Sequence, residues 1–173
     1  HRLYGDECKE QNVAGWKNIC KEYGKKGMGY AEKAMALNPK KVDGYFWYGC
    51  SVGTYSDGVS ILTALKEGLK NKTQSSFETS YKMDKMYEVG GPMKALGRFW
   101  SVLPWPMNDK KKAVMYLEEF SRSFPNDVEG QVYLGQAYKD VKEKDKAKAL
   151  LTKAASSPDK YYANMAKQIL AEM

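Results

Sequence analysis

The sequence predicts an all-α fold of stacked helical hairpins closed by a C-terminal helix. Ala, Leu, Lys, Glu and Met recur in blocks and the six prolines are thinly spread, as expected for helices joined by short loops. Alternating runs rich in Val, Ile and Thr, which are typical of strands, are absent from the sequence. A spacing of large and small residues near the C-terminus recurs upstream. We therefore expect one domain over residues 1–173, in which residues 1–5 form a disordered or non-native end.

The clearest hairpin spans residues 128–158. Leu134, Gly135 and Tyr138 mark its first helix, and Ala147 and Leu151 mark its second. Small residues at Gly135 and Ala147 let two antiparallel helices approach closely, while the large residues fill the space toward a neighbouring hairpin. This order of residues resembles the tetratricopeptide repeat, a pair of helices about 34 residues long.

A similar hairpin precedes it. Gly97 takes the place that Gly135 has in the last hairpin. Asn108 or Asp109 is the expected N-cap of the second helix, and Pro125 ends that helix. This hairpin is longer than the last one, and the surplus lies in a proline-flanked loop over residues 103–109.

The N-terminal half follows the pattern less closely. Residues 6–20 and 30–41 are expected to form a first, degenerate hairpin, with Gly15 inside its first helix. A larger hairpin or a helix triplet follows over residues 44–89. At the other end, residues 159–173 form an amphipathic helix suited to closing the stack.

The charge of the chain is strongly positive. Its formal net charge is +7, from 28 Lys and Arg against 21 Asp and Glu, and such an excess favours acidic partners. Lysines dominate, whereas readers of nucleic-acid sequence usually depend on the planar guanidinium of arginine. We therefore expect no nucleic-acid partner, and lysines that mostly solvate helix surfaces.

Few residues suit catalysis or metal binding. His1 is the single histidine, which argues against histidine-based catalysis and against a multi-histidine metal site. Adjacent carboxylates such as Glu118 and Glu119 point about 100° apart on a helix, so they do not converge on a substrate. The sequence thus predicts no enzyme, no catalytic residue, no metal and no cofactor.

The ends and the cysteines bear on localisation. Cys8, Cys20 and Cys50 form no metal or haem motif, and they fit either one disulfide in an exported protein or three buried thiols.

No stretch approaches the roughly 18 to 20 apolar residues that span a bilayer. Because the chain begins with His1 rather than Met, we expect either a trimmed chain or a mature form from which a leader or lipid anchor has been removed.

Two blocks in the middle of the chain carry a more specific resemblance. They read GYFWYGCSVGTYSDGVSILTALKEGL, at residues 44–69, and MYEVGGPMKALGRFWSVLPWP, at residues 86–106. This succession of an aromatic helix, a glycine-proline turn, a leucine-glycine-arginine helix and a proline-bearing loop resembles the T-component family of tripartite ATP-independent periplasmic (TRAP) transporters. The resemblance implies a periplasmic, often lipid-anchored protein whose hairpins surround a central groove or pore, and which partners a solute-binding protein.

The tetratricopeptide resemblance also implies a binding surface, because the inner side of each first helix lines the concave face of such stacks. The candidates are Trp16 and Phe46 at an aromatic end and Lys94, Arg98, Gln136 and Lys139 at a basic end, flanked by Asn12, Cys20, Cys50, Thr54, Val102, Val132 and Asp140. Such a groove suits a segment of another protein, or a ligand with an apolar body and an acidic head. Trp16 and Phe46 have an alternative as ordinary core residues.

The functional hypotheses follow from this surface. The first is a module that docks a solute-binding or other exported protein through the groove and through Trp105, which is either folded onto the core or offered to a partner. The alternative is a carrier of a small amphipathic or acidic ligand in the groove or pore. An oligomer stays open, since Met83, Met86 and Tyr87 would suit an interface if they are exposed.

Overall fold

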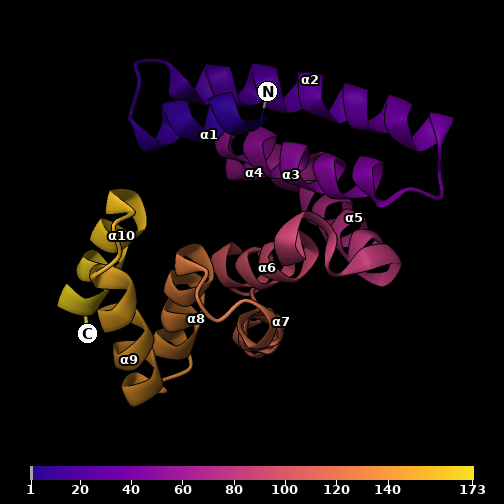
Figure 1. The fold of residues 1–173 in the computed structure, drawn as a ribbon. Helices are drawn as coiled ribbons and strands as arrows, with labels where there is room; N and C mark the ends of the chain where they lie inside the picture. The colour runs from indigo at the N-terminus through magenta and orange to yellow at the C-terminus, as the bar shows by residue number, and fades with distance from the viewer. Residues whose placement is uncertain (1) are drawn as a thin grey trace. The chain divides into compact units, whose positions relative to one another are not determined.

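The computed structural model describes residues 2–173, which form helices and the segments that join them (Figure 1). The helices are α1 (Arg2–Glu10), α2 (Trp16–Leu37), α3 (Val42–Gly58), α4 (Ile61–Lys66), α5 (Leu69–Asp84), α6 (Tyr87–Val102), α7 (Lys110–Ser123), α8 (Val128–Asp140), α9 (Lys144–Ala155) and α10 (Lys160–Ala171). No strand occurs within residues 2–173, which confirms the all-α prediction. His1 lies outside the described residues, and residues 2–5, for which disorder was expected, belong to α1.

The helices group into two compact units. The first unit runs to Tyr87 and holds α1 to α5, and the second spans Glu88–Met173. Each unit buries its own set of apolar side chains. The organisation of the chain as one domain stays a prediction.

The start of the first unit differs from the expected hairpin. Asn12 and Gly15 adopt left-handed backbone conformations, with φ of 50° and 77°, so the chain turns between α1 and α2. Helix α2 then runs without interruption for 22 residues, from Trp16 to Leu37. The prediction of a helix that continues through Gly15 is wrong, because Gly15 is the N-cap of α2 and its φ lies outside the range of a right-handed helix.

Helices α2 and α3 pack side by side at very short range (Figure 1). A Cβ atom added at Gly24 of α2 would lie 2.5 Å from the backbone nitrogen of Tyr55 on α3. At the other end of the pair, a Cβ atom at Gly58 would clash with the backbone of Lys17. A glycine from each helix therefore sets how closely the two backbones approach.

Residues 44–89 mainly form the helix triplet α3, α4 and α5, one of the two expected arrangements. The ring of Phe77 on α5 lies where a side chain at Gly49 of α3 would be, 2.6 Å from the added Cβ atom. The hydroxyl of Ser76 donates to the carbonyl of Tyr45 at 2.8 Å, so a polar contact also joins α5 to α3.

The second unit begins with an unusual backbone. Glu88, Val89 and Gly90 have positive φ values of 48°, 54° and 72°, and the regular helical part of α6 follows them. Glycine tolerates this conformation, whereas a β-branched residue such as Val89 is strained in it. Pro92 lies in the first regular turn, where the missing N–H costs nothing.

The rest of the second unit matches its sequence signals. Asp109 is the N-cap of α7 and accepts a hydrogen bond from the backbone nitrogen of Lys112 at 3.0 Å, and α7 ends at Ser123, before Pro125. Helix α8 packs against α7, α9 and α10. A Cβ atom at Gly135 would lie 2.7 Å from Leu151 on α9, which confirms that this glycine allows α8 and α9 to approach closely.

Candidate functional site

The two aromatic candidates lie in the first unit and far from each other. Phe46 is 6% exposed, and its ring packs against Trp47, Phe77 and Tyr87, with centroids 5.1 to 6.2 Å apart. Trp16 starts α2, next to Lys17, which contacts Gly58 at the C-terminal end of α3. Because Gly58 is 12 residues beyond Phe46, about 18 Å along α3, the two rings do not share a groove. The burial of Phe46 favours its alternative as a core residue.

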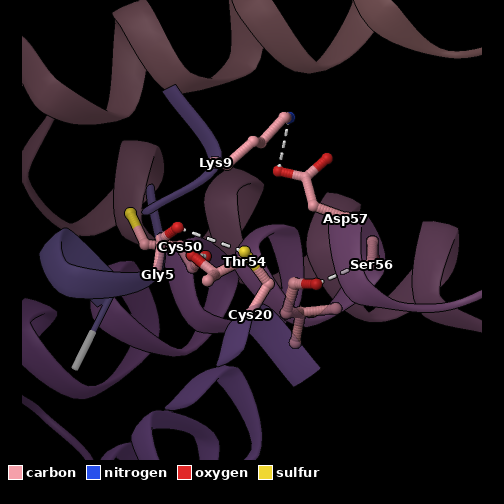
Figure 2. A network of polar contacts seen from close by, with 8 residues as sticks. Gly5, Lys9, Cys20, Cys50, Thr54, Ser56 and Asp57 are labelled. Atoms are coloured by element: carbon pink, nitrogen blue, oxygen red, sulfur yellow. Dashed lines mark hydrogen bonds and ion pairs between the residues drawn. The ribbon is translucent and has the colours of Figure 1, made fainter. Parts of the chain in front are cut away.

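Polar contacts that include the candidate Cys20 hold the helices of the first unit together (Figure 2). The thiol of Cys20 is buried and donates to the carbonyl of Gly5 in α1 at 3.2 Å. Thr54 is also buried, and its hydroxyl donates to the carbonyl of Cys50 at 3.3 Å. Close by, Lys9 of α1 forms an ion pair of 2.8 Å with Asp57 of α3. This network fastens α1 to α2 and α3 and lines no described groove.

The prediction of three buried thiols holds for Cys8 and Cys20 but not for Cys50. Cys8 and Cys20 are buried, Cys50 is half-buried, and all three are thiols. The alternative with one disulfide is therefore not the state seen here.

The basic candidates, in contrast, lie together on one surface of the second unit. Side chains from α6, α8 and α10 meet there, and we call this surface the α6–α8–α10 face. It comprises Lys94, Arg98, Glu129, Tyr133, Gln136, Lys139, Tyr162 and Glu172. Two flanking candidates behave differently: Val132 is completely buried and belongs to the core, whereas Val102 is 55% exposed at the end of α6.

An ion pair joins α6 to α8 at the centre of this face. The ammonium of Lys94 lies 2.5 Å from a carboxylate oxygen of Glu129 and 3.6 Å from one of Asp127. The same ammonium lies 5.2 Å from the centre of the Phe120 ring, a cation–π distance. Lys94 is thus held by two helices and is not a freely moving surface charge.

Beside this pair, an arginine and three tyrosines form a row of contacting side chains. The guanidinium of Arg98 lies 4.7 Å from the centre of the Tyr133 ring. The ring centres of Tyr133 and Tyr162 are 6.4 Å apart, and those of Tyr162 and Tyr161 are 5.0 Å apart. In both pairs the rings are nearly perpendicular. The row runs from α6 across α8 to α10, and Tyr161, at its end, is 42% exposed.

Hydrogen bonds of the tyrosines converge on Glu129. Burial alone would raise the pKa of Glu129, but the Lys94 ammonium and hydrogen bonds from Tyr133 and Tyr162 outweigh it, so the pKa lies below its ordinary value. Burial, followed by the negative charge nearby, raises the pKa of Tyr133. Burial and the neighbouring groups Tyr133 and Glu129 likewise raise the pKa of Tyr162. At neutral pH the carboxyl is therefore charged, and both phenols are protonated donors.

The remaining basic candidates lie farther along α8. Gln136 donates to Asp140 at 3.3 Å, and the ammonium of Lys139 lies 2.7 Å from a carboxylate oxygen of Glu172 after α10. Gln136 and Asp140 follow Tyr133 by three and seven residues, so their contact lies on the same side of α8 as Tyr133. Lys139 follows Tyr133 by six residues and is turned about 120° away from it around the helix. The prediction that Lys94, Arg98, Gln136 and Lys139 line one binding groove stays a prediction.

Trp105 takes one of its two predicted positions. It lies in the loop between α6 and α7 and is 85% exposed. A hydrogen bond of 2.8 Å from the nitrogen of Met107 to the carbonyl of Pro104 closes a tight turn around it. The side chain is thus offered to solvent and not folded onto the core.

The candidate oligomer surface is only partly exposed. Met83 and Met86 are exposed, whereas Tyr87 is half-buried, and its hydroxyl donates to Asp43 at 3.2 Å and accepts from the indole nitrogen of Trp47 at 3.1 Å. Tyr87 therefore serves the packing of the first unit, and an oligomer stays a prediction.

Four residues of the α6–α8–α10 face were missed by the sequence analysis, namely Glu129, Tyr133, Tyr162 and Glu172. The available signal was spacing: Glu129, Tyr133, Gln136 and Asp140 recur at three- and four-residue intervals on one face of α8. Val132 was expected on the exposed face of α8, whereas it is buried in the core.

Among the side chains that the structure describes, no three His, Cys, Asp or Glu residues lie together as a metal ion would require. None of the helices within residues 2–173 combines the length and hydrophobicity needed to cross a membrane.

Comparison with known proteins adds no identification. No model of a known protein family matches the sequence, and no curated protein matches it.

Proposed function

We propose that this chain is a non-catalytic protein-binding module built of tetratricopeptide-like helical hairpins. The packing of the second unit supports this architecture. Gly97 of α6 faces Leu117 of α7, and Gly135 of α8 faces Leu151 of α9, so the same glycine–leucine contact recurs in two successive helix pairs. Recurrence of one contact in successive helix pairs is what a repeat architecture requires, and α10 follows as a closing helix.

The exposure of Trp105 is the observation that carries the binding role. Tryptophan is the largest apolar side chain, and here 85% of its surface faces solvent in a loop shaped by two prolines. Its transfer from water into an interface would contribute about 2 to 4 kcal/mol, the size of an interface hot spot. A small ligand would cover only part of such a protruding side chain, whereas a protein surface can enclose it.

The α6–α8–α10 face supplies a second contact area of suitable composition. Arginine and tyrosine are enriched in the cores of protein interfaces, and Arg98 and Tyr133 are already stacked before any partner arrives. Groups held in place in the free protein lose less conformational entropy on binding.

The nature of the partner is proposed from the sequence resemblance. A solute-binding protein of a TRAP-type transporter, or another exported protein, fits the resemblance of residues 44–69 and 86–106. The chain would then act in the periplasm, with its net charge of +7 favouring an acidic partner.

The test begins with recovery of the partner. The tagged chain is incubated with an extract of its source organism, bound proteins are identified by mass spectrometry, and the affinity of the purified partner is measured by biolayer interferometry. Trp105→Ala is expected to weaken that affinity at least about 10-fold.

A matched control is available in the first unit. Leu37 is 87% exposed, so Leu37→Ala removes a similarly exposed apolar side chain and is expected to change the affinity less than about twofold. Equal affinity of Trp105→Ala and wild type would refute the role of this loop. Recovery of a partner other than a solute-binding protein would leave the binding role and remove the transporter context.

A further inference from the structure

A pocket lies between α7 and α8, away from the α6–α8–α10 face. Its volume is about 360 Å³, and it is lined by Glu118, Ser121, Arg122, Leu134 and Tyr138. Tyr138 follows Tyr133 by five residues, which turns it about 140° around α8, away from the tyrosine row. This hollow is open to solvent over most of its extent, so a ligand would lie on it and would not be enclosed.

The floor of the pocket is apolar and well packed. Leu134 and Tyr138 are 3% and 9% exposed, so they offer only a limited surface, which is held in place by α7 and α9. The ammonium of Lys146 lies 5.3 Å from the centre of the Tyr138 ring and fixes the outer side of the ring. A small apolar group can therefore rest on a rigid floor.

The two charged groups of the pocket do not neutralise each other. Glu118 and Arg122 are one helical turn apart on α7, an arrangement that commonly forms an ion pair. Here a carboxylate oxygen of Glu118 accepts the hydroxyl of Tyr138 at 2.7 Å instead, and no ion pair joins Glu118 to Arg122. Burial, followed by this hydrogen bond, raises the pKa of Tyr138 to about 12, so the phenol stays a donor at neutral pH.

A guanidinium without a carboxylate partner is the feature that defines the ligand. Within the part of the chain that the structure describes, Arg122 has neither a hydrogen bond nor an ion pair. A guanidinium binds a carboxylate through two parallel hydrogen bonds. Ser121, next to it, adds a hydroxyl donor. The carboxylate of Glu118 would repel a second negative charge and attract an ammonium.

We propose that this pocket binds an apolar α-amino acid. The carboxylate of the ligand lies at Arg122 and Ser121, and its ammonium lies at Glu118. Its side chain rests on Leu134 and on the ring of Tyr138. Glu118 and Arg122 lie one turn apart on α7, so both long side chains can reach groups carried by one carbon atom of a ligand. This site is independent of Trp105 and of any protein partner.

The same chemistry is available from two sources. A free amino acid offers a carboxylate and an ammonium, whereas the last residue of a peptide offers a carboxylate and a neutral amide N–H. The charge of Glu118 favours the free amino acid, because an ammonium gives it an ionic partner.

To test this proposal, the full chain is titrated with L-leucine, and the amide signals of α7 and α8 are followed by NMR. Saturable shifts at residues around Arg122 and Tyr138 are expected. Leucinamide, which lacks the carboxylate, is expected to bind at least about 10-fold more weakly. N-acetyl-leucine, which lacks the ammonium, is expected to bind more weakly than leucine, and equal binding would assign the site to the end of a peptide chain.

Single substitutions test the roles of the Arg122 and Glu118 charges separately. Arg122→Gln is expected to weaken leucine binding at least about 10-fold, and Lys148→Gln, which removes the same charge from an exposed position on α9, is expected to leave it unchanged. Glu118→Gln still accepts the Tyr138 hydroxyl and is expected to weaken leucine but not N-acetyl-leucine. The proposal is overturned if leucine causes no shift at about 20 mM, where a millimolar site is nearly saturated, or binds Arg122→Gln like wild type.

Discussion

At the scale of single residues, Glu129 links pH to the stability of the second unit. Its pKa is lower in the folded chain than its ordinary value. Such a carboxyl stabilises the fold above its unfolded pKa, about 4.3, and this contribution is lost as the pH falls through the folded value. Glu129→Gln is therefore expected to lower the free energy of unfolding by about 1 to 3 kcal/mol at neutral pH, and by progressively less below about pH 4. Urea unfolding across this range measures the difference.

The exposed ion pair of the same face provides the control for this experiment. The Glu172 side chain is 68% exposed, so Glu172→Gln removes a contact with Lys139 that is screened by water. Its cost is expected to stay below about 0.5 kcal/mol at every pH. A loss in Glu129→Gln that does not change with pH would contradict the proposed role of its charge.

Residue patterns predicted part of the candidate site. Lys94 and Arg98 were recognisable because basic residues one turn apart on a first helix share a face. Glu129 was not, because its environment includes Lys94 of α6 and a hydrogen bond from Tyr162, a residue more than 30 positions away. A contact between distant segments leaves no trace in local spacing.

At the scale of elements, the pairing of α2 with α3 depends on Gly24. A methyl group there would meet the backbone of Tyr55, which cannot rotate away. Gly24→Ala is expected to lower the free energy of unfolding by about 1 to 3 kcal/mol. Thermal and urea unfolding of the purified variant measure this change.

Gly29, on the same helix, is the matched control. No heavy atom lies within 4 Å of a Cβ atom added there, so Gly29→Ala gains helix propensity without a clash. It is expected to raise the stability by about 0.5 to 1 kcal/mol. Equal effects of the two substitutions would show that α2 and α3 are not held at this distance.

The bounds of a helix could be predicted where local sequence signals set them, but not where a contact with a distant segment did. Helix α7 was bounded correctly, because its cap at Asp109 and its stop before Pro125 are local signals. Helix α2 was not, because residues 21–29 were assigned to no helix, whereas Gly24 lies inside α2 as a contact point with Tyr55. Gly15, expected inside a helix, begins one through its positive φ.

At the scale of the whole molecule, the two units make a fragment experiment informative. The core of the second unit, including Leu96, Leu117, Phe120 and Leu151, lies entirely within Glu88–Met173. A fragment of residues 88–173 is therefore expected to fold alone, with helical circular dichroism, dispersed NMR signals and a cooperative thermal transition. A fragment that stays unfolded would favour the single domain expected from the sequence.

The buried thiol of Cys20 makes the first unit a reporter of its own motion. Its side chain is 0% exposed and is bonded to the carbonyl of Gly5 in α1, so a thiol reagent reaches it only after α1 has separated from α2. Cys50, which is half-buried, serves as an internal reference for ordinary accessibility. The labelling rate of Cys20 in the native protein thus measures how often the amino-terminal helix opens, without any added probe.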